Sequence, residues 1–229
     1  MTRSPMMTAL TTGRGAAALC AALAYALALG SAAATPTGPI TEPAGNFLPS
    51  YTGPQNSDLD VLSADAVYTG TDYILSATLA GAVGTTPGAL YVWGFDRGQG
   101  TARFAAIAPG VTFDSVVSIS VGGTTAVRDL ISGAATTLAA SAVTVSGDSV
   151  AVDVSAALLL SEGLAPDAYL VNLWPRLGSG NNNQISEFVP TDSDFQVRFV
   201  PEPASAALLA AALAGVAMIR RPARARSAV

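Results

Sequence analysis

Residues Val143–Val152 read VTVSGDSVAV, and this stretch is the clearest indication of the fold in the 229-residue chain. Two runs in which Val alternates with small or polar residues flank the pair Gly147-Asp148. Such a pair between two alternating runs is typical of the two-residue turn of a β-hairpin. The stretch therefore predicts two antiparallel strands joined by a tight turn.

Short strands are expected on both sides of this hairpin. Tyr73–Ala80 alternates between two faces, and Ala89–Phe95 is an aromatic and β-branched run flanked by Gly and Pro. Similar runs predict strands at Leu59–Tyr68, Ala102–Ile107, Ser115–Val121, Thr125–Leu130, Ala142–Ser146, Ser149–Val154, Tyr169–Trp174 and Phe195–Val200. Roughly ten short strands, with turn residues about every 8 to 12 positions, predict an all-β fold, either an antiparallel β-sandwich or a jelly roll.

One helical segment is expected within this region, at Ala156–Ser161. Ser155 would cap its N-terminus, and Gly163 would end it. Residues 35–57 are rich in Pro, Gly and Thr and lack apolar periodicity, so we expect a linker or an irregular lead-in there. The β-sandwich domain is therefore placed at residues 58–200.

Residues 1–34 have the features of a secretory signal peptide, which forms an N-terminal helix. Arg3 and Arg14 precede an apolar run over 16–29, and small residues before Thr35 offer a cleavage site after Ala34. As a helix this run would rise only about 21 Å, whereas the hydrocarbon layer is about 30 Å thick, which argues against a permanent membrane span. Cys20 follows Leu19, where a lipoprotein signal would have a small residue, so we expect Cys20 to be removed with the signal.

A second sorting segment, residues 201–229, follows the predicted domain. Pro201-Glu202-Pro203 precedes an apolar run over 204–219, and Arg residues follow at positions 220, 221, 224 and 226. As a helix the apolar run would reach about 24 Å, which is enough to cross a thin or deformed bilayer. The Arg cluster places the end of the chain on the cytoplasmic side. The sequence therefore predicts a C-terminal transmembrane helix.

This C-terminal pattern resembles the PEP-CTERM sorting signal of Gram-negative bacteria, over about residues 200–229. The resemblance implies recognition by an exosortase, a membrane protease-transpeptidase that acts near Pro201, Glu202 and Pro203, with Arg220 and Arg221 completing the signal. It also implies export through the secretion machinery, with a transient stay or an anchor in the inner membrane. The protein would then be at the cell surface or in the extracellular matrix.

Composition excludes several kinds of chemistry. The chain has no His, its basic residues are all Arg, and it has one Cys, so imidazole bases, Lys nucleophiles and thiolate zinc sites are excluded. Between residues 35 and 203 there are 16 acidic residues against five Arg, a formal charge of −11. Such a segment lacks the basic surface that nucleic acids and anionic lipids require. Neutral sugars, cations and basic partners stay open as ligands.

Acidic loops offer one candidate site. Asp58 and Asp60, and Asp96 in the loop DRGQG, place carboxylates beside backbone carbonyls and glycines, as a calcium site requires. Neither loop matches a defined calcium-binding spacing. The alternative is that Asp occurs in turns because its side chain binds the local backbone. No other cofactor is expected.

Aromatic residues offer a second candidate site. Tyr91, Trp93 and Phe95 share one strand face, where an exposed row would stack on sugar rings and a row facing inward would belong to the core. Trp174-Pro175 has the same two interpretations. The loop GSGNNN at 178–183 is either a ligand loop rich in amide donors or a hairpin tip.

The leading functional hypothesis is a non-enzymatic, exported, exosortase-processed protein associated with exopolysaccharide or biofilm. A carbohydrate-binding module is the second hypothesis, based on the aromatic row. A polysaccharide-active enzyme that uses two carboxylates is the third, although chance alone brings some pair among 16 acids within catalytic distance.

Overall fold

The computed structural model describes residues 35–200, and all of them belong to one compact unit of the chain. The predicted signal peptide, the sorting motif Pro201-Glu202-Pro203 with Arg220 and Arg221, and the predicted membrane helix at 204–219 lie outside the described residues. They therefore stay predictions. Within residues 35–200, no helix is both long and apolar enough to span a membrane.

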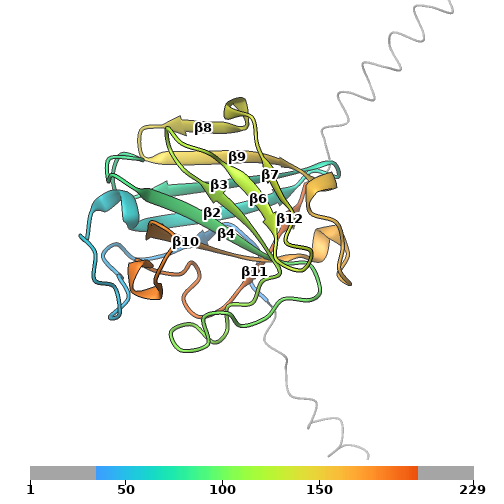
Figure 1. The fold of residues 1–229 in the computed structure, drawn as a ribbon, viewed down its shortest axis with the longest axis horizontal. Helices are drawn as coiled ribbons and strands as arrows, with labels where there is room; N and C mark the ends of the chain where they lie inside the picture. Colours follow the sequence, from blue (N-terminus) through green and yellow to red (C-terminus); the bar gives the residue numbers. More distant parts are fainter. Residues whose placement is uncertain (1–34, 201–229) are drawn as a thin grey trace, which may run out of the picture. The chain divides into compact units, whose positions relative to one another are not determined.

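The described fold is mostly β, in two sheets of six strands each (Figure 1). Sheet 1 has the order β1-β2-β3-β9-β8, with β12 beside β2, and sheet 2 has the order β11-β10-β4-β5-β6-β7. All pairs are antiparallel except β12 with β2. The strands of sheet 1 are β1 (Ile40–Thr41), β2 (Val61–Tyr68), β3 (Asp72–Leu79), β8 (Val143–Ser146), β9 (Ser149–Ser155) and β12 (Arg198–Phe199). Those of sheet 2 are β4 (Ala89–Asp96), β5 (Ser115–Ile119), β6 (Ala126–Asp129), β7 (Ala135–Thr137), β10 (Leu170–Leu177) and β11 (Phe195–Gln196).

Short 3-10 helices connect some of the strands. They are η1 (Ser57–Leu59), η2 (Ala140–Ala142), η3 (Ala156–Leu158), η4 (Pro166–Ala168) and η5 (Asn182–Gln184). The helix expected at Ala156–Ser161 is thus only the single turn η3, and Ser155 makes no side-chain capping hydrogen bond there. That prediction was wrong in length, because Leu159 has a non-helical backbone (φ −126°, ψ 61°) and the N–H groups of Glu162 and Leu164 donate to Arg97 O on another segment.

The predicted hairpin is confirmed by β8 and β9. Ser146 pairs with Ser149 across the turn, and Gly147 has a φ of +61°, a left-handed conformation that favours glycine. All but one of the other predicted strands overlap an observed strand. Alternation over a few residues was therefore a reliable local indicator of strands in this chain.

Ala102–Ile107 was wrongly predicted as a strand. Its residues form turns, in which Phe104 O accepts hydrogen bonds from Ile107 N and Ala108 N. Alanine fits poorly on a pleated surface, and this run contains three of them, so local turn bonding prevails over strand pairing. The segment is part of the long loop between β4 and β5, drawn in green in Figure 1.

The predicted strand Phe195–Val200 divides between the two sheets. β11 pairs with β10 in sheet 2, whereas β12 pairs in parallel with β2 in sheet 1. Val197 lies between them, is 1% exposed, and donates its N–H to Tyr169 O. The chain therefore passes from one sheet to the other at this residue.

Residues 35–57, expected to be a linker or irregular lead-in, are irregular apart from β1 and the start of η1. They are nevertheless bound to the rest of the fold. Leu48 N donates to Ser186 O at 2.7 Å, and Tyr51 is buried with Leu59 and Ala89.

One hydrophobic cluster draws its residues from both sheets. Sheet 1 contributes the inward faces of β2, β3 and β9, and sheet 2 contributes those of β4, β5 and β10. A second cluster lies on the opposite face of sheet 2, where the β4–β5 loop and the segment after η5 cover Trp174 and Val92. Sheet 2 therefore has apolar packing on both faces. On its outward face, these two segments cover only part of the sheet.

Candidate functional site

The outward face of sheet 2 holds a cavity of about 410 Å³, within the range of roughly 300 to 1,000 Å³ common for ligand pockets. It is lined by three arginines, by apolar and aromatic side chains, and by a few small residues. We call it the arginine groove, and it consists of Leu90, Val92, Arg103, Phe104, Phe113, Val116, Ser118, Ala126, Arg128, Leu130, Ala135, Trp174, Arg176 and Ser179.

Strand alternation places these side chains on one face. In β6, Val127 faces the core and is 3% exposed, so Arg128 points outward. Across the sheet, Arg128 pairs with Val116 of β5 and with Ala135 of β7, and both of these residues also line the groove. A single row of cross-strand neighbours thus runs across three strands of the groove.

An aromatic cluster supports one side of the groove. The Trp174 ring lies 5.2 Å from Phe104, 5.0 Å from Phe113 and 6.0 Å from Phe188, measured between ring centroids. Gly94 lies beneath it, where a Cβ atom would come within 2.6 Å of Trp174 Cζ3. Trp174 is 2% exposed, so it contributes mainly support and little contact surface.

Arg176 is a buried cation at the end of the groove. It is 9% exposed, and it donates from Nε to Gly178 O at 2.6 Å and from Nη2 to Asn181 O at 3.1 Å. Within residues 35–200 it forms no ion pair, and burial lowers the pKa of its guanidinium. The 178–183 loop, a candidate ligand loop in the sequence, is thereby held beside the groove, which Ser179 lines.

Arg103 and Arg128 complete the positive charge of the groove. Both are exposed, and Arg103 lies with its guanidinium carbon 5.9 Å from the centre of the Phe113 ring. Neither forms an ion pair with a described residue, in contrast to Arg97 and Arg198. No Asp or Glu of the described chain is among the residues that line the groove.

A buried ion cluster behind the groove anchors the β4–β5 loop. Arg97 Nε donates to Asp114 Oδ1 at 2.7 Å, and its Nη2 lies 3.2 Å from Asp129 Oδ2 and 4.0 Å from Glu162 Oε1. Burial alone would lower the pKa of Arg97, but the hydrogen bond and charge of Asp114 raise it. Asp114 also accepts from the backbone N–H groups of Arg97 and Gln99. Both ends of the loop that carries Arg103 and Phe113 are therefore fixed.

The aromatic row expected as a candidate sugar site lies in the core. Tyr91, Trp93 and Phe95 are each 0% exposed and belong to the cluster shared by the two sheets. Period-two alternation put them on one face, but that face is the buried one, so no sugar ring can stack on them. The outward neighbours Leu90 and Val92 line the groove instead.

The three aspartates expected as calcium ligands bind backbone groups and hydroxyls. Asp58 accepts from Thr86 N at 2.7 Å, Asp60 accepts from Gly45 N at 2.9 Å, and Asp96 accepts from Gly98 N and Gly100 N. No cluster of three or more acidic, His or Cys side chains suited to a metal ion occurs in residues 35–200. Asp96 therefore binds its own loop, as the alternative interpretation describes, whereas Asp58 and Asp60 hold segments that are 28 and 15 residues away in the sequence. Calcium binding stays a prediction.

Asp96 and Asp194 share a hydrogen-bond partner, the Thr112 hydroxyl. The Thr112 hydroxyl lies 2.8 Å from Asp194 Oδ2 and 3.1 Å from Asp96 Oδ2, and it can donate to only one of them at a time. Burial raises the pKa of Asp194 to about 6, and the charge of Asp96 adds to this effect. Neither carboxylate lines the arginine groove. Through Thr112, the two aspartates connect the end of β4 and the segment before β11 to the β4–β5 loop.

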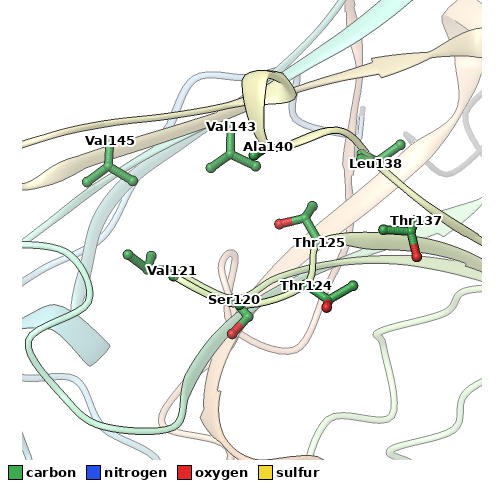
Figure 2. Close-up of a pocket in the computed structure, with 11 residues that line it drawn as sticks. Ser120, Val121, Thr124, Thr125, Thr137, Leu138, Ala140, Val143 and Val145 are labelled. Carbon is green, nitrogen blue, oxygen red and sulfur yellow. The ribbon is translucent and has the colours of Figure 1, made fainter.

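A second concavity, of about 500 Å³, lies between the edges of the two sheets. Figure 2 shows Val143 and Val145 of β8 on one side and Val121, Thr124 and Thr125 of the β5–β6 connection on the other. Its described lining is apolar or hydroxylic and includes no charged or aromatic side chain. Few groups there could orient a ligand.

No protein-family model matches the chain, and no curated protein matches it either. Sequence reasoning missed Arg103, Arg128 and Arg176 as a set, because they are far apart along the chain and the average charge is negative. Arg128 and Arg176 lie in the strands β6 and β10, whereas Arg103 lies in the turns of the β4–β5 loop, so no shared local pattern marks the three residues.

Proposed function

We propose that this chain is an exported, exosortase-processed, non-enzymatic matrix protein whose folded domain binds polysaccharide in the arginine groove. The observation that carries the binding proposal is a groove that combines apolar surface with cationic groups which have no carboxylate partner within residues 35–200. Leu90 and Val116, which are both partly exposed, offer apolar contact to the CH faces of sugars. The arginines offer hydrogen-bond donors at the rim.

We further propose that the two sheets form a β-sandwich of the jelly-roll type. The support is the hydrophobic cluster to which both sheets contribute their inward faces. In this arrangement the arginine groove lies on the outer surface of one sheet, where a long polymer can pass across the strands without entering a closed cavity.

Export and processing are proposed from the two ends of the sequence. Residues 1–34 resemble a signal peptide, and residues 201–229 resemble a PEP-CTERM tail. The expected mature form begins near Thr35 and ends near Pro201–Pro203. Mass spectrometry of the protein from the cell surface and medium, with and without the exosortase, would measure both termini. A product that keeps residues 204–229 in cells with active exosortase would contradict processing and indicate a membrane-anchored protein.

Filling the groove is expected to weaken polysaccharide binding. Ala126 lies on the outward face of β6, paired with Ser118 of β5, and both line the groove. Ala126→Trp would place a bulky ring in the groove, two residues from Arg128 on the same face of β6, so affinity for a bound polysaccharide should fall at least about tenfold, which is about 1.4 kcal/mol. Binding can be measured by affinity electrophoresis against a panel of neutral and acidic polysaccharides.

Ile74→Trp is the matched control, because Ile74 is 41% exposed on the other sheet and lies outside the groove. It should bind like the unmodified protein. Circular dichroism would establish that both variants keep their strands. Equal binding by Ala126→Trp and Ile74→Trp, or no binding by the unmodified protein to any polysaccharide, would refute the groove as the site.

A further inference from the structure

The charge of the arginine groove is opposite to that of the segment around it. Between residues 35 and 203 the formal charge is −11, yet three of the five Arg residues in this segment line one cavity. The other two, Arg97 and Arg198, are bound to carboxylates. At physiological ionic strength the Debye length is about 8 Å, so a ligand in the groove responds mainly to the nearby arginines.

We infer that the groove selects an anionic polysaccharide, one with carboxylate or sulfate groups along its chain. This inference rests on the proposed function, because it names the chemical class of the polymer that the groove binds. It departs from the expectation based on the average charge of the segment, which left neutral sugars, cations and basic partners open as ligands.

Arg176 provides a preorganised contact for such a group. Its guanidinium is held by the carbonyl oxygens of Gly178 and Asn181, while its Nη1 donates to no described residue. The side chain is more than nine-tenths buried and lines the groove. A guanidinium fixed in this way loses little conformational freedom when it binds a carboxylate, and its planar fork suits the two oxygens of that group.

The spacing of the arginines favours a polymer over a small anion. Arg176 is on β10 and Arg128 is on β6, and the strand order β10-β4-β5-β6 separates them by three inter-strand steps. At about 4.8 Å per step, their backbones are about 14 Å apart across the sheet alone. One phosphate or sulfate ion would therefore contact one of them, whereas a chain with repeated charges would contact both.

Apolar surface occupies the space between these cationic positions. Leu90 pairs with Arg176, Val116 pairs with Arg128, and Val92 lies on the same outward face of β4 as Leu90. Sugar rings present apolar CH faces between their charged substituents, so this surface matches a charged sugar chain. Nucleic acid fits less well, because binding of single strands depends on exposed aromatic rings, and Phe104, Phe113 and Trp174 are all less than a tenth exposed.

The test compares polymers that differ in charge. Polygalacturonate carries carboxylates, its methyl ester is neutral, and dextran sulfate and dextran provide the corresponding sulfated and neutral pair. The protein should bind the anionic member of at least one pair at least about tenfold more tightly, and added salt should weaken that binding. Comparison of the two anionic polymers shows whether carboxylate or sulfate is preferred.

The double variant Arg103→Gln with Arg128→Gln should reduce binding to the anionic polymer by about tenfold. Both side chains are exposed, so the fold should be kept. The control is Arg198→Gln, which removes one positive charge outside the groove and should bind like the unmodified protein. It is compared with Arg128→Gln alone, which removes one positive charge from the groove and should bind the anionic polymer more weakly.

The outcomes separate the inference from the proposed function. Equal affinity for charged and neutral polymers would overturn the inference and leave polysaccharide binding in place. Binding to none of the polymers would overturn both. Tighter binding to polyuridylate than to either anionic polysaccharide would overturn the choice of sugar polymer and would indicate a nucleic-acid ligand.

Discussion

Replacement of Arg97 by Met is expected to lower the free energy of unfolding by about 3 to 5 kcal/mol. Arg97 and Asp114 are each 1% exposed, and their ion pair is closed at 2.7 Å. Met fills a similar volume but leaves the Asp114 carboxylate buried without its cation. Removal of one partner from a buried pair is costly for this reason, even where the intact pair contributes little.

The loss can be measured by urea denaturation followed by tryptophan fluorescence, since Trp93 and Trp174 are both buried. Arg198→Gln is the control, because its ion pair with Asp65 is at the surface, with 41% and 18% of the two side chains exposed. Such pairs contribute about 0 to 1 kcal/mol. Equal destabilisation by the two variants would contradict a structural role for the Arg97 cluster.

Arg97→Met should also weaken polysaccharide binding. The cluster fixes the loop that carries Arg103, Phe104 and Phe113, and these residues form one wall of the arginine groove. Affinity should therefore fall at temperatures well below the unfolding transition.

The stability of the protein is expected to decrease as pH rises from about 5 to about 9. Burial raises the pKa of Glu187 from 4.5 to about 8; the hydrogen bond from Val61 N opposes this rise, and the charges of Asp60 and Glu42 add to it. The folded state therefore keeps a proton that the unfolded state has lost. The resulting stabilisation is complete below pH 4.5, and it is lost as pH rises through about 8.

The size of this effect follows from linkage. In the interval where only the folded state is protonated, each pH unit costs about 1.4 kcal/mol, so Glu187 accounts for several kcal/mol. Asp194, with a pKa raised from 3.8 to about 6, contributes in the same direction at lower pH. Glu187 lies next to Phe188, which packs against Trp174 and Phe104. Alkaline pH should therefore also loosen the aromatic cluster that supports one side of the arginine groove.

Glu187→Gln is expected to remove most of this pH dependence above pH 6. Its carbonyl oxygen can still accept the hydrogen bond from Val61 N, and it carries no charge to bury. At pH 9 the variant should therefore be more stable than the unmodified protein, as urea midpoints at pH 5, 7 and 9 would show. Asp194→Asn should flatten only the region between about pH 4 and 6. A midpoint that is the same for Glu187→Gln and the unmodified protein at pH 9 would refute the assignment.

Local pattern predicted individual strands well. The β8–β9 hairpin follows from VTVSGDSVAV, because alternation and a Gly-Asp turn act within a few residues. The alternation pattern was not sufficient where other interactions compete with strand pairing. Ala102–Ile107 has strand-like length, but its alanines pair weakly and turn bonds form instead. In Phe195–Val200, sequence could not show that the chain changes sheets at Val197, because both halves look alike locally.

The candidate site was less predictable than the strands. Alternation showed that Tyr91, Trp93 and Phe95 share a face, but the period of two is symmetric, so it does not tell which face is covered. The shared cluster of the two sheets decides that they are inside. The outward face, which alternation assigns to Leu90 and Val92, became significant only because β10, β5 and β6 add arginines beside it.

The sequence by itself determined the chemistry that is excluded, the predominance of short strands, and the export hypothesis carried by its two ends. These depend on composition or on residues close together in the chain. Tertiary structure alone decided which face of each strand is buried and which charges meet. Arg103, Arg128 and Arg176 come to line one groove through the strand order β10-β4-β5-β6 and through a loop fixed by Arg97. Average charge cannot reveal such a site, because electrostatic interaction depends on distance in space.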